Sequence, residues 1–266
     1  MNTTTGVPTS AVYGFSTLVL KLLREESPKG IAFARDAKVA TFRHLEYSEY
    51  KAQRDPVPSA LGSQFAWLDR LLDALALPTY TVPGFEADDV LATLARELST
   101  NGERVRLVSG DRDLFQVLGP EIDILFVGRR QQKPIVYDAA AVEARFGVEP
   151  SRLPSYMALV GDTSDNLPGV PGVGPRTAAK LLARHHDIPA LFERLDAVTP
   201  PSLRDALAAA EARVRQNERL ARLDAAVAIP DGPRYALPSP EAFERVRALF
   251  TELEFKSLLA RLPRPA

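Results

Sequence analysis

Hydrophobic residues recur at two different spacings along the first half of the chain. Apolar side chains three or four positions apart, such as Val12, Phe15 and Val19, predict amphipathic helices. Short apolar runs bounded by polar residues or proline predict strands. The predicted helices are Ser10–Glu26, Leu61–Leu77, Glu86–Leu98 and Asp113–Leu118, and the predicted strands are Gly30–Ala34, Thr79–Pro83, Arg104–Ser109, Ile122–Val127 and Ile135–Tyr137.

The order of these elements predicts the fold class. Helices alternate with strands up to residue 137, which favours an α/β layer with a mainly parallel central sheet flanked by helices. Helical patterns dominate after that point, so we expect a helical lobe. We place the division between an α/β domain, residues 1–160, and the helical lobe, residues 161–266. Residues 37–58 are polar, aromatic and basic and follow neither spacing.

Composition excludes several kinds of site. The 266 residues include no cysteine, which excludes a disulfide framework, a thiolate zinc site and a cysteine nucleophile. Three histidines are too few for a histidine-rich metal site. We see no signal peptide and no apolar run of membrane-spanning length, so we expect a soluble cytoplasmic protein without a membrane partner. The net charge of −1 leaves nucleic acid open as a partner, because the distribution of charge decides that question.

Acidic residues follow the ends of the predicted strands. In open α/β sheets ligands gather at the carboxyl ends of the strands, so these side chains would share one edge. A single acidic residue in a first helical turn is ordinary, since it favours the helix dipole, but four such groups are harder to explain this way. Crowded carboxylates repel one another, and hard cations such as Mg²⁺ or Mn²⁺ relieve that repulsion. The eight candidates are Asp36, Glu86, Asp88, Asp89, Asp111, Asp113, Asp162 and Asp165.

A turn rich in glycine and proline comes directly after the last two acidic residues. Its glycines permit positive φ and leave no side chain in the way of a phosphate. Pro175 suits the first turn of a helix, where the amides at the end of the turn would face an anion. Two cations four residues apart would lie on one face of that helix. The predicted phosphate-binding residues are Gly169, Gly172, Val173, Gly174, Arg176 and Lys180.

Five motifs carry a resemblance to a known family. They are FxxDAK at Phe33–Lys38, FRHxxYxxYKxxR at Phe42–Arg54, VPGFEADDVLATLA at Val82–Ala95, SGDRDLFQVL at Ser109–Leu118 and GDTSDNLPGVPGVGPRTAAKLL at Gly161–Leu182. In order, and over nearly the whole chain, the sequence resembles the 5′ nuclease domain, a PIN-like, flap-endonuclease-like domain found at the N-terminus of bacterial DNA polymerase I and as a free-standing protein. The resemblance implies a two-metal-ion nuclease that cleaves DNA or RNA at 5′ ends and at the base of 5′ flaps.

The resemblance also implies roles for individual residues. Matching positions assign Asp36, Glu86 and Asp88 to a first metal ion and Asp111, Asp113 and Asp165 to a second, with Asp162 beside them and Asp89 in support. The glycine turn matches a helix–hairpin–helix-type element that grips duplex phosphates and is a candidate K⁺ site. Residues 37–58 match an arch over the 5′ single strand. There the expected phosphate ligands are Arg43, Lys51 and Arg54, and the expected base-stacking residues are Tyr47 and Tyr50.

The start of the chain departs from the family pattern. Family members begin with an apolar strand ending in Asp-Gly, and that aspartate is a metal ligand. Here residues 1–10 match the loop after the strand, so we expect the N-terminal strand to be missing. Two explanations stay open, a start assigned at an internal methionine and a short paralogue with weakened catalysis.

Two alternative functions also remain open. A non-catalytic binder of DNA junctions and a PIN-like ribonuclease compete with the nuclease, although the arch and the glycine turn argue against the ribonuclease. We expect a monomer acting on DNA with 5′ ends or flaps, with DNA polymerase I as a candidate partner.

Overall fold

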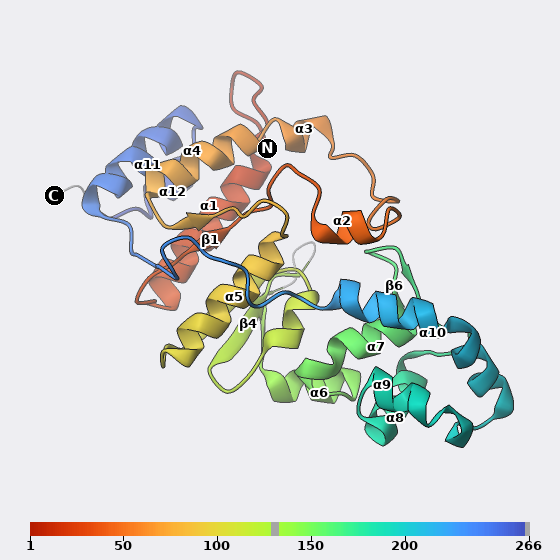
Figure 1. The fold of residues 1–266 in the computed structure, drawn as a ribbon. Helices are drawn as coiled ribbons and strands as arrows, with labels where there is room; N and C mark the ends of the chain where they lie inside the picture. The colour runs from red at the N-terminus through yellow and green to blue at the C-terminus, as the bar shows by residue number, and fades with distance from the viewer. Residues whose placement is uncertain (129–132, 264–266) are drawn as a thin grey trace. The chain divides into compact units, whose positions relative to one another are not determined.

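The computed structural model describes residues 1–128 and 133–263, which fall into two compact units (Figure 1). The first unit comprises Met1–Arg35, Asp55–Tyr80 and Arg234–Ala266, and the second comprises Asp36–Arg54 and Thr81–Pro233. This division differs from the one we placed at residue 160. The reason is that the last helices of the chain share an apolar core with the first helix.

The first unit is mainly helical. Its core joins Val12 of the first helix to Leu71 and Leu75 of the fourth and to Phe250 and Phe255 near the end of the chain. A short parallel pair of strands, β1 and β2, is also present. The elements of this unit are α1 (Ser10–Glu25), β1 (Phe33–Ala34), α3 (Ser59–Gly62), α4 (Phe65–Leu75), β2 (Thr79–Tyr80), α11 (Pro240–Glu252) and α12 (Lys256–Leu259).

The second unit begins with a short helix and a three-stranded sheet. Strand β4 lies in the middle, parallel to β3 and antiparallel to β5. Leu107 and Ile124 of this sheet pack in one core with Phe115, Leu159 and Leu182. The elements up to this point are α2 (Phe42–Glu46), α5 (Ala87–Thr100), β3 (Val105–Ser109), the 3₁₀ helix η1 (Asp113–Val117), β4 (Ile122–Phe126) and β5 (Ile135–Tyr137).

The rest of the second unit is the helical lobe, in which α7 and α10 pack side by side (Figure 1). A two-stranded hairpin, β6 and β7, interrupts its helices and leads into the glycine turn. Its elements are α6 (Ala139–Phe146), η2 (Pro150–Arg152), α7 (Leu153–Val160), β6 (Gly161–Asp162), β7 (Leu167–Pro168), α8 (Pro175–His185), α9 (Ile188–Glu193), η3 (Leu195–Ala197) and α10 (Pro201–Ala221).

The α/β class and the helical lobe are confirmed, with two differences. In the described residues the strands predicted for one parallel sheet form two separate sheets, β1–β2 and β3–β4–β5, since β1 and β2 pair only with each other. The helix predicted over Leu61–Leu77 is divided into α3 and α4. Gly62 has low helix propensity, and the Gln64 side chain accepts a hydrogen bond from the Ala11 amide of α1. Among the described residues no helix has the length and apolar character to cross a bilayer.

Candidate active site

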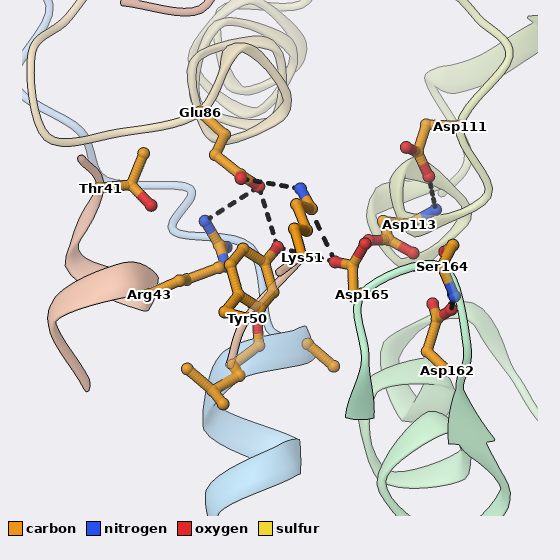
Figure 2. A network of polar contacts seen from close by, with 12 residues as sticks. Thr41, Arg43, Tyr50, Lys51, Glu86, Asp111, Asp113, Asp162, Ser164 and Asp165 are labelled. Carbon is orange, nitrogen blue, oxygen red and sulfur yellow. Dashed lines mark hydrogen bonds and ion pairs between the residues drawn. The ribbon is translucent and has the colours of Figure 1, made fainter. Parts of the chain in front are cut away.

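All eight predicted carboxylates belong to the second unit. They come from four places: the segment before α2, the start of α5, the end of β3 with η1, and the hairpin β6–β7. Figure 2 shows carboxylates from three of these places around the Tyr50 and Lys51 side chains. The acidic residues that we predicted to share one edge of the fold therefore fall within one unit.

The start of α5 is built to hold its acidic residues in place. Glu86 is the N-cap, and its backbone amide donates to the Asp89 carboxylate at 3.0 Å in a capping box. The Ala87 amide donates to Asp36 Oδ1 at 2.7 Å. Carboxylates are favoured here by the positive end of the helix dipole. Asp88 lies in the first turn of this helix, between Ala87 and Asp89, whose contacts these are.

The other two acidic groups are held by short local hydrogen bonds. Asp111 Oδ1 accepts the Asp113 amide at 3.0 Å. Asp162 Oδ1 accepts both the amide and the hydroxyl of Ser164, at 2.7 and 2.6 Å. These Asx-type contacts fix the orientation of the Asp111 and Asp162 carboxylates, the first just before η1 and the second at the end of β6.

Two basic side chains from the segment 37–58 enter the carboxylate group. Lys51 Nζ lies 2.7 Å from Glu86 and 3.7 Å from Asp165 (Figure 2). Arg54 donates to Asp165 at 2.9 Å from a half-exposed position. The Lys51 backbone has φ of 56°, in the left-handed region that non-glycine residues rarely adopt. Strain of this kind persists where the surroundings enforce it, and it is common at functional sites.

The remaining carboxylates carry more negative charge than these cations offset. Burial raises the pKa of Asp88 to about 7, and the charges of Asp111 and Asp36 add to the rise. Burial, together with the charge of Asp111, raises the pKa of Asp113 well above its ordinary value. Burial also raises the pKa of Asp165, against the opposing charge of Lys51. A positive charge placed here would therefore be strongly stabilised.

The carboxylate oxygens of this group have the chemistry that a hard divalent cation requires. Their positions, however, do not yet form a coordination site. Carboxylate oxygens are the ligands that Mg²⁺ and Mn²⁺ prefer. Within the described part of the chain, however, no three Asp, Glu or His side chains converge closely enough to form a ready-made ion site. Lys51 holds Glu86 by an ion pair, so ion binding requires these side chains to rearrange.

Two residues, Arg43 and Tyr50, have other contacts than those we predicted. Arg43, expected to contact phosphate, is 1% exposed and donates to both oxygens of Asp89 at 2.7 Å. Tyr50, expected to stack on bases, is 2% exposed, and its hydroxyl donates to Asp165 at 2.7 Å. Asp89 is fully buried in the Arg43 ion pair and the α5 cap. The predicted DNA contacts of Arg43 and Tyr50 are corrected accordingly, because burial removes both side chains from the surface.

The glycine turn combines an exposed basic face with a tightly packed start. Arg176 and Lys180 of α8 are exposed, as are Gly172 and Gly174, whereas Val173 is buried. The Val173 amide, expected to face an anion, donates instead to the Val170 carbonyl at 3.0 Å. This amide is therefore occupied within the turn.

Three residues that the sequence did not single out connect the segment 37–58 to the hairpin loop. Gln53 donates to the Thr163 carbonyl at 2.7 Å, and Asn166 donates to the Glu49 carbonyl at 2.7 Å. The Ser164 carbonyl accepts a hydrogen bond from Arg54 Nε at 3.2 Å. More than a hundred residues separate the two segments of the first two contacts, so no local pattern could have indicated them.

The chain is similar to bacterial DNA polymerases I. It is 38% identical over 257 residues to DNA polymerase I of Mycobacterium bovis, a match covering 97% of this chain and 28% of that protein. It is 38% identical over 259 residues to the thermostable DNA polymerase I of Thermus filiformis, covering 97% of this chain and 30% of that protein. The chain thus spans less than a third of the length of these relatives.

Solved structures share the fold. A bacteriophage T5 5′-exonuclease with bound zinc ions matches with a TM-score of 0.70 at 21% identity, over 95% of this chain and 91% of that chain. A T5 flap endonuclease in complex with DNA and metal ions gives 0.69 at 19% identity, over 96% and 90%. The catalytic core of Rad2 with a DNA substrate gives 0.63 at 17% identity, over 97% and 85%.

Two family models together match most of the chain. Residues 1–147 match the 5′-3′ exonuclease N-terminal resolvase-like domain. Residues 148–240 match the 5′-3′ exonuclease C-terminal SAM fold. The first match contains the three-stranded sheet β3–β5, and the second match covers most of the helical lobe. With the carboxylates gathered in one unit, these matches show that the chain belongs to the 5′-3′ exonuclease family.

Proposed function

We propose that this chain is a structure-specific nuclease that hydrolyses phosphodiester bonds at 5′ ends and at the base of 5′ flaps in DNA. The observation that carries the proposal is the group of mutually repelling carboxylates in the second unit, most of them partly buried, with the pKa of Asp88 raised to about 7. Repulsion among these carboxylates destabilises the fold unless cations neutralise them. In a nuclease the same cations also stabilise the negative charge of the phosphate that is cut. The family membership supports the same reaction.

Two divalent ions, Mg²⁺ or Mn²⁺, are the proposed cofactors. Such ions, when bound, neutralise the charge of the scissile phosphate and activate water. The residues proposed to hold them are Asp36, Glu86 and Asp88 for the first ion and Asp111, Asp113 and Asp165 for the second, with Asp162 beside them. The crystallised T5 enzymes with bound metal ions support a divalent requirement.

Lys51 and Arg54 are proposed to act on the 5′ strand. Both cations border the carboxylates, and Arg54 is half exposed. A phosphate approaching the carboxylates would meet an ammonium and a guanidinium at the same edge, which offsets the repulsion by the acidic groups. Their effect should therefore fall on cleavage more than on the affinity for a blunt duplex.

The glycine turn is proposed to grip the duplex behind the cleavage point. The exposed glycines leave room for a phosphate, and Arg176 and Lys180 provide charge on the following helix. A K⁺ ion held by turn carbonyls belongs to this proposal. Because the relatives are DNA polymerases I, a DNA polymerase I is the proposed partner. We propose that this chain acts as a monomer.

A panel of substrates tests the proposed function. Single-turnover cleavage in Mg²⁺ would be compared for a 5′-flap duplex, a 3′-flap duplex, a blunt duplex and a 5′ flap made of RNA. We expect cleavage near the base of the 5′ flap and little at the 3′ flap. Equal cleavage of both flaps, or none of either, would contradict the proposal.

A second candidate is a DNA-junction binder without catalysis. The observation that favours it is the lack of a ready-made ion site among the described residues. Such a binder would hold the 5′-flap duplex tightly in the presence of Mg²⁺ and Mn²⁺ and leave it intact. The substrate panel separates the two functions, because affinity and cleavage are measured on the same molecules.

A further inference from the structure

Two side chains of α10 hold the segment that joins the carboxylate hairpin to the glycine turn. Asn217 Nδ2 donates to the Pro168 carbonyl at 2.9 Å, and Arg213 Nη2 donates to the Gly169 carbonyl at 3.3 Å. Arg213 and Asn217 are four residues apart, so they lie on one face of α10. Asn217 is 2% exposed, which makes its hydrogen bond a buried one.

The backbone that they hold has little freedom to move. A Cβ atom at Gly169 would lie 2.2 Å from the Val160 carbonyl oxygen, so this glycine allows a very close approach of two chain segments. The Val170 amide donates to the Leu159 carbonyl at 2.9 Å, one residue further along each of the two segments. A displacement at Pro168 would therefore be passed on to the residues before and after it.

The residues on either side of this segment have different proposed tasks. Asp162 and Asp165, in the hairpin before it, belong to the carboxylates proposed to hold the metal ions. The turn Gly169–Gly174, after it, is proposed to hold the duplex. The distance between the cut phosphate and the held phosphate is therefore set by the few residues that α10 holds in place.

The hydrogen bond from Arg213 to Gly169 does more than stabilise the fold. Its Nε is buried and has no hydrogen-bond partner among the described residues. A buried donor without a partner destabilises the fold. A side chain held at this cost, with one bond of 3.3 Å, suits a role in placing the Gly169 carbonyl.

We propose that Arg213 and Asn217 are positioning residues that set the cleavage register, meaning which phosphodiester of the 5′ strand is cut relative to the duplex held by the turn. They act through the Pro168 and Gly169 carbonyls. The proposal rests on the nuclease function proposed above. Loss of either hydrogen bond lets the hairpin and the turn shift relative to each other, so neighbouring phosphodiesters compete for the same carboxylates.

The test maps the products of a labelled 5′-flap duplex at single-nucleotide resolution, under single turnover in Mg²⁺. Asn217→Leu keeps the approximate shape and removes the donor, and Arg213→Met removes the guanidinium at a partly exposed site. Arg213→Lys retains a donor. Arg215→Met is the matched control, because Arg215 lies on the same helix and pairs with Glu211 at a surface position.

We expect the first two variants to change the ratio of neighbouring cuts roughly tenfold, since a misplacement of about 1 Å can alter a rate by about a hundredfold. Arg213→Lys and Arg215→Met should keep the wild-type product. An unchanged product in both Asn217→Leu and Arg213→Met, even with a lower rate or melting temperature, would overturn the inference alone. An absence of cleavage by the wild-type chain would overturn the proposed function and the inference with it.

Discussion

At Arg43, a side chain whose sequence context suggests a phosphate ligand is instead part of the interior. Burial disfavours its charge, yet the hydrogen bonds and the charge of Asp89 raise the pKa of Arg43 above its already high value. The guanidinium also donates to the carbonyls of Leu220 and Arg222, so α2, α5 and the end of α10 meet at this ion pair.

Arg43→Met should therefore destabilise the protein more than it weakens DNA binding. Removing one partner of a buried ion pair leaves the other charge unpaired, which costs roughly 3–5 kcal/mol. Arg54→Met is the matched control, because its ion pair with Asp165 is half exposed on the arginine side and is worth about 1 kcal/mol or less. Urea unfolding of both variants gives the comparison. Unchanged stability with a large loss of DNA affinity in Arg43→Met would restore the phosphate role.

The raised pKa of Asp88 makes a prediction about pH. In the unfolded chain this carboxyl titrates near 3.8, and in the metal-free fold it titrates at about 7. Between these values the folded state binds more protons than the unfolded state, so the free energy of unfolding falls as pH rises. The stabilising contribution of the Asp88 carboxyl is fully present below its unfolded pKa of 3.8 and is lost as the pH rises through its folded pKa of about 7.

Asp88→Asn should remove part of this pH dependence. In excess chelator, the variant should be more stable than the wild-type chain at pH 8, by up to about 4 kcal/mol, and nearly equal to it at pH 4. Chemical denaturation at the two pH values measures the difference. A variant that is less stable than the wild-type chain at pH 8 would show that the Asp88 carboxylate is satisfied without an ion.

At the scale of elements, the glycine turn contains two kinds of glycine. Gly169 is required by packing, because a Cβ would collide with the Val160 carbonyl. Gly172 has φ of 80° and would place its Cβ in open space, with no atom within 4 Å. The first glycine is needed for folding, and the second is available for a phosphate to approach.

Gly172→Val should keep the fold and weaken duplex binding by roughly tenfold, about 1.4 kcal/mol. The left-handed backbone itself costs about 1–2 kcal/mol with a side chain. Gly102→Val is the matched control, since Gly102 has φ of 84° and also has open space around it, but lies in the loop after α5. Duplex affinity at fixed salt and melting temperature would be measured for both. Equal affinity in the two variants would exclude the turn as the duplex site.

Most elements could be predicted because their patterns are local. The helix over Ser10–Glu26 became α1, and the strand Arg104–Ser109 became β3, each within a residue of the prediction. The helix α2 was missed, since only five residues form it. The strand Thr79–Pro83 shortened to two residues, and proline within it cannot donate to a sheet partner.

The sequence could indicate that the acidic residues gather in one part of the fold, but it could not indicate which side chains contact them. Acidic residues at strand ends can be recognised from their position directly after an apolar run in the sequence. The placement of Lys51 between Glu86 and Asp165 depends on the docking of residues 49–54 onto a hairpin more than a hundred positions away. The burial of Arg43 depends on Asp89 and on the end of α10, which no periodicity connects.

At the scale of the whole molecule, the proposed chemistry belongs to one unit. The eight carboxylates, Lys51, Arg54 and the glycine turn all lie in the second unit, and the first unit has its own apolar core. The chain has a net charge of −1, so its overall charge gives no general attraction to DNA. Binding and cleavage must then depend on the local cations and on divalent ions that offset the carboxylates.

The dependence of cleavage on divalent ions tests this account most directly. The single-turnover rate on a 5′-flap duplex would be measured over a range of Mg²⁺ and Mn²⁺ concentrations, in the wild-type chain and in Asp113→Asn, with DNA binding measured in parallel. The account predicts a saturable rate that rises more steeply than first order in the ion, no cleavage in excess chelator, and an Asp113→Asn variant that binds the flap but does not cut it. Cleavage that persists in excess chelator, or in Asp113→Asn at the wild-type rate, would contradict it.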